Sequence, residues 1–188
     1  MRAWCLVVVP AIGCAQLFGI DETTGPKAGI DSGVAIDARR DAPPSIDAAI
    51  CEGGDARATD PMTGACYTYF AQPLGRTEAR ERCGSLGGGT MLATVQTAGE
   101  NQLILSLIGM STAFLGGNDE LVEGSFKWDD GTDVVLANWN MGEPNNGTGL
   151  FEEDCIVIHG MFAGKWDDRP CASSPNIAGA YPFVCERD

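Results

Sequence analysis

Two short stretches near the C-terminus decide how this chain folds: Glu143-Pro144-Asn145 and Gly164-Lys165-Trp166-Asp167-Asp168. Both lie in the most acidic part of the chain, residues 119–168, where twelve carboxylates are opposed by two lysines, a net charge of −10. If several of these carboxylates converge in the fold, their mutual repulsion has to be relieved by protonation or by a cation. The segment therefore predicts a cation site, and the alternative is a solvated acidic face.

The donor atoms of this segment favour calcium. Beside the carboxylates, its side chains offer amide oxygens, those of Asn138, Asn140, Asn145 and Asn146. Calcium takes roughly six to eight such hard oxygens in flexible geometry, whereas zinc prefers nitrogen and sulfur. The chain has a single histidine, His159, which excludes multi-histidine zinc sites. No nucleophile–base pair is evident, so the sequence does not predict an enzyme.

The overall composition is that of an acidic, loop-rich globular protein. The chain has 188 residues, with 26 acids against 12 lysines and arginines, and therefore a net charge of −14. This balance argues against nucleic acid as a partner, because a binder must neutralise phosphates with clustered lysine and arginine. The length predicts one domain, or one domain with an appendage.

Residues 1–14 have the features of an export signal. Arg2 precedes the apolar run of residues 6–12, which is too short to span a bilayer. The ending Ala11-Ile12-Gly13-Cys14 resembles a bacterial lipobox, in which the cysteine is lipidated and becomes the mature N-terminus. The alternative is an ordinary secretory signal cut near Ala15. Both predict a secreted or cell-surface protein, and the lipobox predicts a bacterial outer-membrane lipoprotein that meets the membrane only through a lipid anchor at Cys14.

Residues 15–50 are expected to be a disordered tether, followed by one domain over residues 51–188. The tether holds three prolines and a single aromatic side chain, Phe18, so it cannot bury enough apolar surface to offset its ordering entropy. The domain holds all three tyrosines, three of the four tryptophans and six of the eight cysteines. In an exported protein these six cysteines indicate disulfides, and their spacing leaves the pairing open.

Two helices followed by short strands predict an α+β fold. The first helix is expected from about Arg76 to Leu86, with Thr77 as its candidate cap and Gly87-Gly88-Gly89 as its stop. The second is expected over residues 97–109, because a Thr-x-x-Glu capping box opens it. Short strands are expected near residues 113–115, 125–128, 154–159, 164–166 and 181–185. Residues 131–153 show no clear strand, and a loop of this length inside a domain is usually functional.

In order and spacing, the motifs of residues 51–188 resemble the C-type lectin-like domain in its long form. The matching stretches are Arg80-Glu81-Arg82-Cys83, Phe114-Leu115-Gly116-Gly117-Asn118-Asp119, Glu123-Gly124-Ser125-Phe126-Lys127-Trp128-Asp129-Asp130-Gly131-Thr132, Asn138-Trp139, Glu143-Pro144-Asn145, Glu153-Asp154-Cys155, Gly164-Lys165-Trp166-Asp167-Asp168 and Phe183-Val184-Cys185-Glu186. The resemblance implies two helices, small antiparallel sheets and a long calcium-binding loop. It also implies the disulfides Cys83–Cys185 and Cys155–Cys171, with Cys51–Cys66 as the additional pair of the long form.

The resemblance further implies two calcium sites. The ligands of the principal site would be Glu143, Asn145, Glu153, Asp167 and Asp168, with Pro144 after a cis peptide bond, which X–Pro linkages allow at low cost. A second site would use Asp119, Glu123, Asn146, Glu153 and Asp154. The segment between Asn146 and Glu152 is longer than the commonest family loop, so Glu152 is an alternative to Glu153 as ligand.

A sugar would sit among Glu143, Asn145, Glu153 and Asp167, with two of its neighbouring hydroxyls replacing water on the ion. Within the family, the order Glu-Pro-Asn goes with mannose, fucose and glucose types of sugar, because the glutamate accepts and the asparagine donates a hydrogen bond. Asp167 departs from the pattern, since sugar-binding members usually have asparagine there and an ionised carboxylate cannot donate. Asp167→Asn is therefore expected to tighten sugar binding.

The sequence thus predicts a calcium-dependent carbohydrate-binding module. The alternative is a protein-binding or structural lectin-like module in which calcium only orders the long loop. Of the other side chains, Trp128, Trp139 and Trp166 are expected mostly in the core, and His159 as a partly buried strand residue. Positive charge close to the acids, such as that of Arg169, is expected only to offset their charge.

Overall fold

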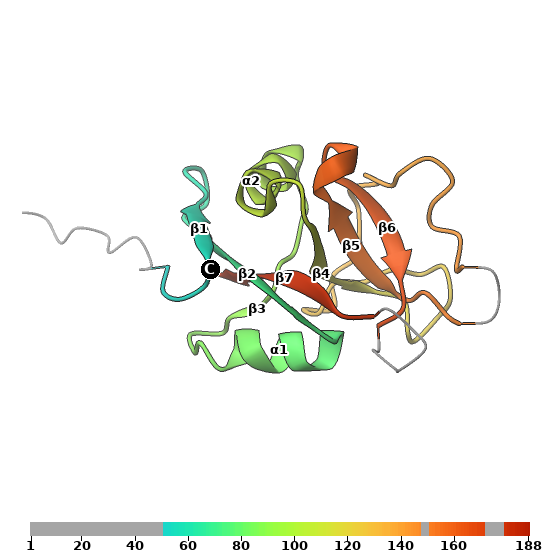
Figure 1. Ribbon diagram of the computed structural model, residues 1–188, viewed down its shortest axis with the longest axis horizontal. Helices are drawn as coiled ribbons and strands as arrows, with labels where there is room; N and C mark the ends of the chain where they lie inside the picture. Colours follow the sequence, from blue (N-terminus) through green and yellow to red (C-terminus); the bar gives the residue numbers. More distant parts are fainter. Residues whose placement is uncertain (1–50, 148–150, 172–178) are drawn as a thin grey trace, which may run out of the picture. The chain divides into compact units, whose positions relative to one another are not determined.

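A computed structural model describes residues 51–147, 151–171 and 179–188 (Figure 1). One seven-stranded sheet has the order β1-β2-β7-β4-β5-β6, with β3 paired to β7. In chain order the elements are β1 (Ala56–Thr59), β2 (Cys66–Leu74), α1 (Arg76–Gly84), β3 (Met91–Leu92), α2 (Ala98–Ile108), β4 (Thr112–Asn118), β5 (Cys155–His159), the 3-10 turn η1 (Gly160–Phe162), β6 (Lys165–Arg169) and β7 (Tyr181–Arg187). The expected α+β class is confirmed. In these described ranges no helix is long and apolar enough to cross a membrane.

The two helices cover opposite faces of the sheet (Figure 1). Leu115 of β4 packs in one core with Ile104 of α2, whereas the preceding Phe114 packs in the other core with Ala79 and Cys83 of α1. Alternate strand residues point to opposite faces, so strands covered on both sides are apolar without interruption. The buried run of residues 155–158 in β5 is of this kind.

Three disulfides fasten the described chain, and they are the pairs that the resemblance implies. Cys83–Cys185 joins α1 to β7, Cys155–Cys171 joins β5 to the segment after β6, and Cys51–Cys66 joins the start of the described chain to β2. Each contributes about 2–4 kcal/mol in an ordinary case.

The helix starts differ in how well the sequence predicts them. At α2 the Thr97 hydroxyl accepts from Glu100 N at 3.2 Å and the Glu100 carboxylate accepts from Thr97 N at 2.9 Å, so the capping box is confirmed. The predicted Thr77 cap is wrong. The N-cap of α1 is Gly75, which bears no capping side chain, and Thr77 lies inside the first helical turn. The same helix ends at Gly84 rather than Leu86, and the chain then turns through three glycines with positive φ.

Four of the five expected strands are confirmed as β4, β5, β6 and β7. The fifth, residues 125–128, contributes only isolated bridges from Lys127 to Asn118 and to Asp133. Three strands were not predicted from the sequence: β1 and β2, which precede both helices, and the short β3 between the helices. The described part of residues 131–153 lacks any named strand, as expected.

Candidate metal centre

The hairpin of β5 and β6 places two neighbouring aspartates at the edge of the acidic loop. Asp167 pairs with Val157 and Asp168 with Ile156, and both aspartates are buried, 3% and 1% exposed. The preceding Trp166 is fully buried, and its Nε1 donates to Asn101 Oδ1 of α2 at 2.8 Å. The sheet register and the anchored tryptophan thus hold two carboxylates in the interior, where an unpaired charge is costly.

The Glu143-Pro144 peptide bond is cis, as expected, and the loop around it docks on Asp168. The Asp168 carboxylate accepts from Asn145 N at 3.0 and 3.1 Å and from Asn146 N at 2.7 Å. Upstream, Asn140 N donates to Trp166 O at 2.8 Å, so the loop runs beside β6 before it turns. These contacts bring Glu143-Pro144-Asn145 and the Asp167-Asp168 pair into one site.

Glu143, Asp167 and Asp168 form what we call the proline-loop cluster: one carboxylate oxygen from each lies within 4.8 Å of the others. The partial burial of Glu143, followed by the charges of Asp167 and Asp168, raises the pKa of its carboxyl group. The Glu143 carboxylate also accepts a hydrogen bond from the Asn145 side-chain amide. Converging buried carboxylates of this kind favour a bound cation.

Asp167 shows where such a cation would bind. Its Oδ2 accepts from Arg169 Nη2 at 2.5 Å and lies 3.0 Å from His159 Nε2. Its Oδ1 is buried and has no hydrogen-bond partner among the described residues. A buried carboxylate oxygen without a partner is rare in folded proteins unless an ion or water occupies the position. Neither His159 nor Arg169 was predicted in the site from the sequence, although alternation along β6 puts Asp167 and Arg169 on one face.

Glu153 lies beside the proline-loop cluster without belonging to the group of three. Its Oε1 is 3.5 Å from Arg169 Nη1, and its side chain is 12% exposed. The pKa of the Glu153 carboxyl group is raised above its ordinary value. Burial is the largest cause, the positive charge of Arg169 opposes it, and the charges of Asp168 and Asp167 add to it. Glu152 instead accepts from Asn146 Nδ2 at 2.8 Å. Of the two alternatives, Glu153 is the one that shares a partner with Asp167, since both contact Arg169.

Asp119, Glu123 and Asp154 form a second group, the turn cluster, again with one oxygen from each within 4.8 Å of the others. Asp119 is buried; its Oδ2 accepts from Gly124 N at 2.7 Å and its Oδ1 has no partner in the described chain. Burial is the main cause that raises the pKa of Asp119 to about 6. Burial and then the charges of Glu120, Glu152 and Asp168 also raise the pKa of Asp154.

The remaining predicted residues are placed as follows. Trp128 and Trp166 are buried in the core and Trp139 packs against it, which confirms their structural role. Asn146, expected at the second site, accepts from Glu153 N at 2.8 Å through Oδ1. Cys14, the export signal and the tether lie outside the described residues.

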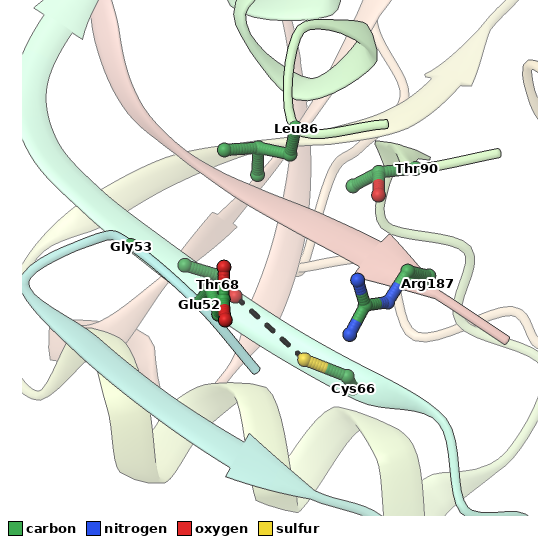
Figure 2. A pocket seen from close by; sticks show the side chains of 7 residues that line it. All are labelled: Glu52, Gly53, Cys66, Thr68, Leu86, Thr90 and Arg187. Atoms are coloured by element: carbon green, nitrogen blue, oxygen red, sulfur yellow. Dashed lines mark hydrogen bonds between the residues drawn. The ribbon is translucent and has the colours of Figure 1, made fainter. Parts of the chain in front are cut away.

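A separate cavity of about 250 Å³ lies between β2 and the end of β7 (Figure 2). Thr68, Leu86 and Arg187 are among the residues that line it, and none of the lining residues belongs to either acidic cluster. This cavity is therefore separate from both groups of carboxylates that could hold a metal ion in the described chain.

Comparison with known proteins gives a consistent result. The family model of the lectin C-type domain matches residues 72–187. The low affinity immunoglobulin epsilon Fc receptor of Mus musculus is 34% identical over 122 residues, 65% of this chain and 34% of the receptor, so the chain spans about a third of that relative's length. Among solved structures, the human scavenger receptor C-type lectin carbohydrate-recognition domain has a TM-score of 0.61 at 27% identity, covering 73% of this chain and 99% of that domain. The cow carbohydrate-recognition domain of CD23, crystallised in the presence of a GlcNAc2Man3 oligosaccharide, has a TM-score of 0.60 at 25% identity, covering 72% and 95%.

Proposed function

The chain belongs to the C-type lectin domain family, and we propose that residues 51–188 are a calcium-dependent carbohydrate-binding module. The observation that carries this proposal is the proline-loop cluster, where three carboxylates converge and one of them, Asp167, has a buried Oδ1 without a hydrogen-bond partner among the described residues. Hard oxygen donors without a nitrogen or sulfur ligand fit calcium better than zinc or a transition metal.

The ligands of the principal ion would be Glu143, Asn145, Glu153, Asp167 and Asp168. The turn cluster would hold a second ion through Asp119, Glu123 and Asp154, with oxygens of Asn146 and Glu153 next to it. Both sets fit the donor chemistry of calcium, because each includes a buried carboxylate oxygen that has no other partner in the described chain.

Calcium, when bound, supplies coordination positions that two neighbouring sugar hydroxyls can fill. Glu143 accepts a hydrogen bond from one hydroxyl while Asn145 donates to it; the two side chains already contact each other across the loop. This order of acceptor and donor supports hydroxyl pairs of the mannose, fucose and glucose type. A single shallow site binds with millimolar affinity, about −4 kcal/mol, so useful avidity needs several copies.

We further propose that the module is displayed outside the cell on residues 15–50. The sequence of residues 1–14 supports export, and Cys14 supports a lipid anchor on a bacterial outer membrane. Labelling cells with radioactive palmitate would test the anchor: incorporation that Cys14→Ser abolishes is expected, and label retained in that variant would contradict it.

A second candidate function is a protein-binding or structural module in which calcium only orders the loop. Two features favour it. The Asp168 carboxylate holds the loop through the backbone N–H groups of Asn145 and Asn146. The Asp167 carboxylate, when ionised, has no hydrogen-bond donor to offer a sugar.

A glycan array probed with the full chain in calcium, and again in chelator, separates the two candidates. The carbohydrate-binding module predicts signals on mannose-, fucose- or glucose-type glycans that the chelator abolishes. No glycan signal in saturating calcium, together with a raised melting temperature, would favour the structural module.

A further inference from the structure

The second hydroxyl of a bound sugar would meet only acceptors from the side chains so far assigned to it. Under the proposed function that hydroxyl would lie between Glu153 and Asp167, and both of these residues are carboxylates. One hydroxyl has a single proton to donate, whereas its oxygen also needs a donor facing it. A nearby N–H group is therefore needed to donate to the oxygen of this hydroxyl.

Arg169 is the cation that bridges these two carboxylates. Its Nη2 lies 2.5 Å from Asp167 Oδ2 and its Nη1 lies 3.5 Å from Glu153 Oε1. A guanidinium carries N–H donors in a rigid fork, and these two contacts are its side-chain contacts within the described ranges, so further N–H groups remain for a ligand there. The side chain is 38% exposed, so part of the group faces the solvent at the rim of the cluster.

We propose that Arg169 donates the hydrogen bond to the sugar hydroxyl that Asp167 cannot provide, and so is a specificity-determining residue of the binding site. This inference rests on the proposed function. The contacts of the other cation on β6 set Arg169 apart: Lys165 Nζ donates to Asn138 Oδ1 at 3.0 Å and has no ion pair with a cluster carboxylate in the described ranges. Of these two cationic side chains on β6, only that of Arg169 contacts both Asp167 and Glu153.

The test is a double-mutant cycle on the full chain with methyl α-mannoside as the probe. The variants are Arg169→Met, Asp167→Asn and both together, with Lys165→Met as the matched control that removes one positive charge from the same strand. Sugar affinity is measured at a calcium concentration that saturates each variant, and calcium affinity is measured separately by calorimetry.

Arg169→Met is expected to weaken sugar binding about two- to tenfold at saturating calcium, the effect of one hydrogen bond. Lys165→Met is expected to leave it unchanged. In the Arg169→Met background, Asp167→Asn is expected to restore sugar binding, because the amide brings back an N–H donor. In the wild-type background the same substitution is expected to increase sugar affinity by a smaller factor.

Unchanged sugar affinity in a folded Arg169→Met protein would overturn the inference, as would equal losses in Arg169→Met and Lys165→Met. An Asp167→Asn gain of the same size in both backgrounds would also contradict it. These results concern Arg169 alone; if the wild-type chain shows no chelator-sensitive binding to any glycan, the proposed function itself fails.

Discussion

The two acidic clusters have the same number of carboxylates but different surroundings. In the proline-loop cluster, Asp168 accepts from two backbone N–H groups and Asp167 contacts Arg169 and His159. The acids of the turn cluster form no ion pair with a lysine or arginine in the described ranges, and Asp119 receives a backbone N–H from Gly124.

The difference indicates two ways of keeping carboxylates together before a cation arrives. In the proline-loop cluster, backbone N–H groups hold the Asp168 carboxylate and a guanidinium holds the Asp167 carboxylate, so these groups are already positioned for an ion. In the described ranges the turn cluster has no lysine or arginine partner, and burial raises the pKa of Asp119 to about 6. We therefore expect calcium to bind the proline-loop cluster more tightly.

The largest effect is expected from Asp168→Ala. It removes a carboxylate that is 1% exposed and leaves the backbone N–H groups of Asn145 and Asn146 without their acceptor. We expect the tighter calcium site to be lost, and the free energy of unfolding in chelator to fall by about 2–4 kcal/mol. Calorimetry and urea denaturation measure the two quantities.

As a control, Asp133→Asn breaks an exposed ion pair with Lys127 and should cost less than about 1 kcal/mol of stability. Tight calcium binding that persists in Asp168→Ala would show that Asp168 is not part of the site.

A smaller effect is expected from Gly147→Ala. Gly147 has φ +61°, and an added Cβ would lie 3.1 to 3.2 Å from the Glu153 carboxylate. Gly142, in the same loop, also has positive φ, +95°, but its Cβ would meet nothing within 4 Å. Both alanine variants should lose about 1 kcal/mol of stability from backbone strain.

Only Gly147→Ala should in addition weaken calcium binding, because it displaces Glu153. Calcium titrations of the two variants side by side provide the measurement. Equal calcium affinities would mean that Glu153 does not bind the ion.

The pH dependence of stability should distinguish stabilisation of the turn cluster by protonation from its stabilisation by calcium. Folding raises the pKa of Asp119 to about 6, so the folded chain keeps a proton that the unfolded chain releases between about pH 4 and 6. In chelator, the melting temperature should therefore rise as the pH falls from about 7 towards 4, and saturating calcium should remove part of that rise.

Glu186, whose pKa burial raises to about 7, lies outside both clusters and should contribute equally with and without calcium. The difference between the two pH profiles thus isolates the clusters. Asp119→Asn should reduce this difference, and an unaltered difference in that variant would assign it to other acids.

The smallest effect is expected from Glu123→Gln. Glu123 is an exposed member of the turn cluster, and its amide would keep one oxygen donor while removing a charge. We expect a several-fold weaker second calcium site by calorimetry, with calcium-dependent sugar binding unchanged. A loss of sugar binding would show that the two clusters do not act separately.

Local sequence signals predicted the parts of the fold that depend on few residues. The capping box at Thr97 fixed the start of α2, and the apolar run of residues 155–158 predicted β5. The disulfides followed from the family resemblance rather than from spacing. The N-cap of α1 was not predicted because the residue at that position, Gly75, has no side chain that could signal a cap in the sequence. Strand β2 was missed because its first five residues are buried without the alternation that marks a half-exposed strand.

The convergence of Glu143, Asp167 and Asp168 was predictable from the sequence motifs, but the cations that contact them were not. The motifs Glu143-Pro144-Asn145 and Asp167-Asp168 indicated carboxylates and amides that the fold brings together. The contact of His159 with Asp167 depends on the register of β5 against β6, in which Val157 pairs with Asp167. The placement of Glu153 rather than Glu152 beside Arg169 likewise depends on the loop, whose path no short-range pattern fixes.

Calorimetric titration of calcium into the full chain, stripped of metal with chelator, tests the central claim most directly. We expect saturable heat whose tightest component Asp168→Ala removes, and a gain of about 2.7 kcal/mol in stability at a hundred times the dissociation constant. Absence of heat and an unchanged melting temperature at millimolar calcium would contradict a metal centre in the proline-loop cluster.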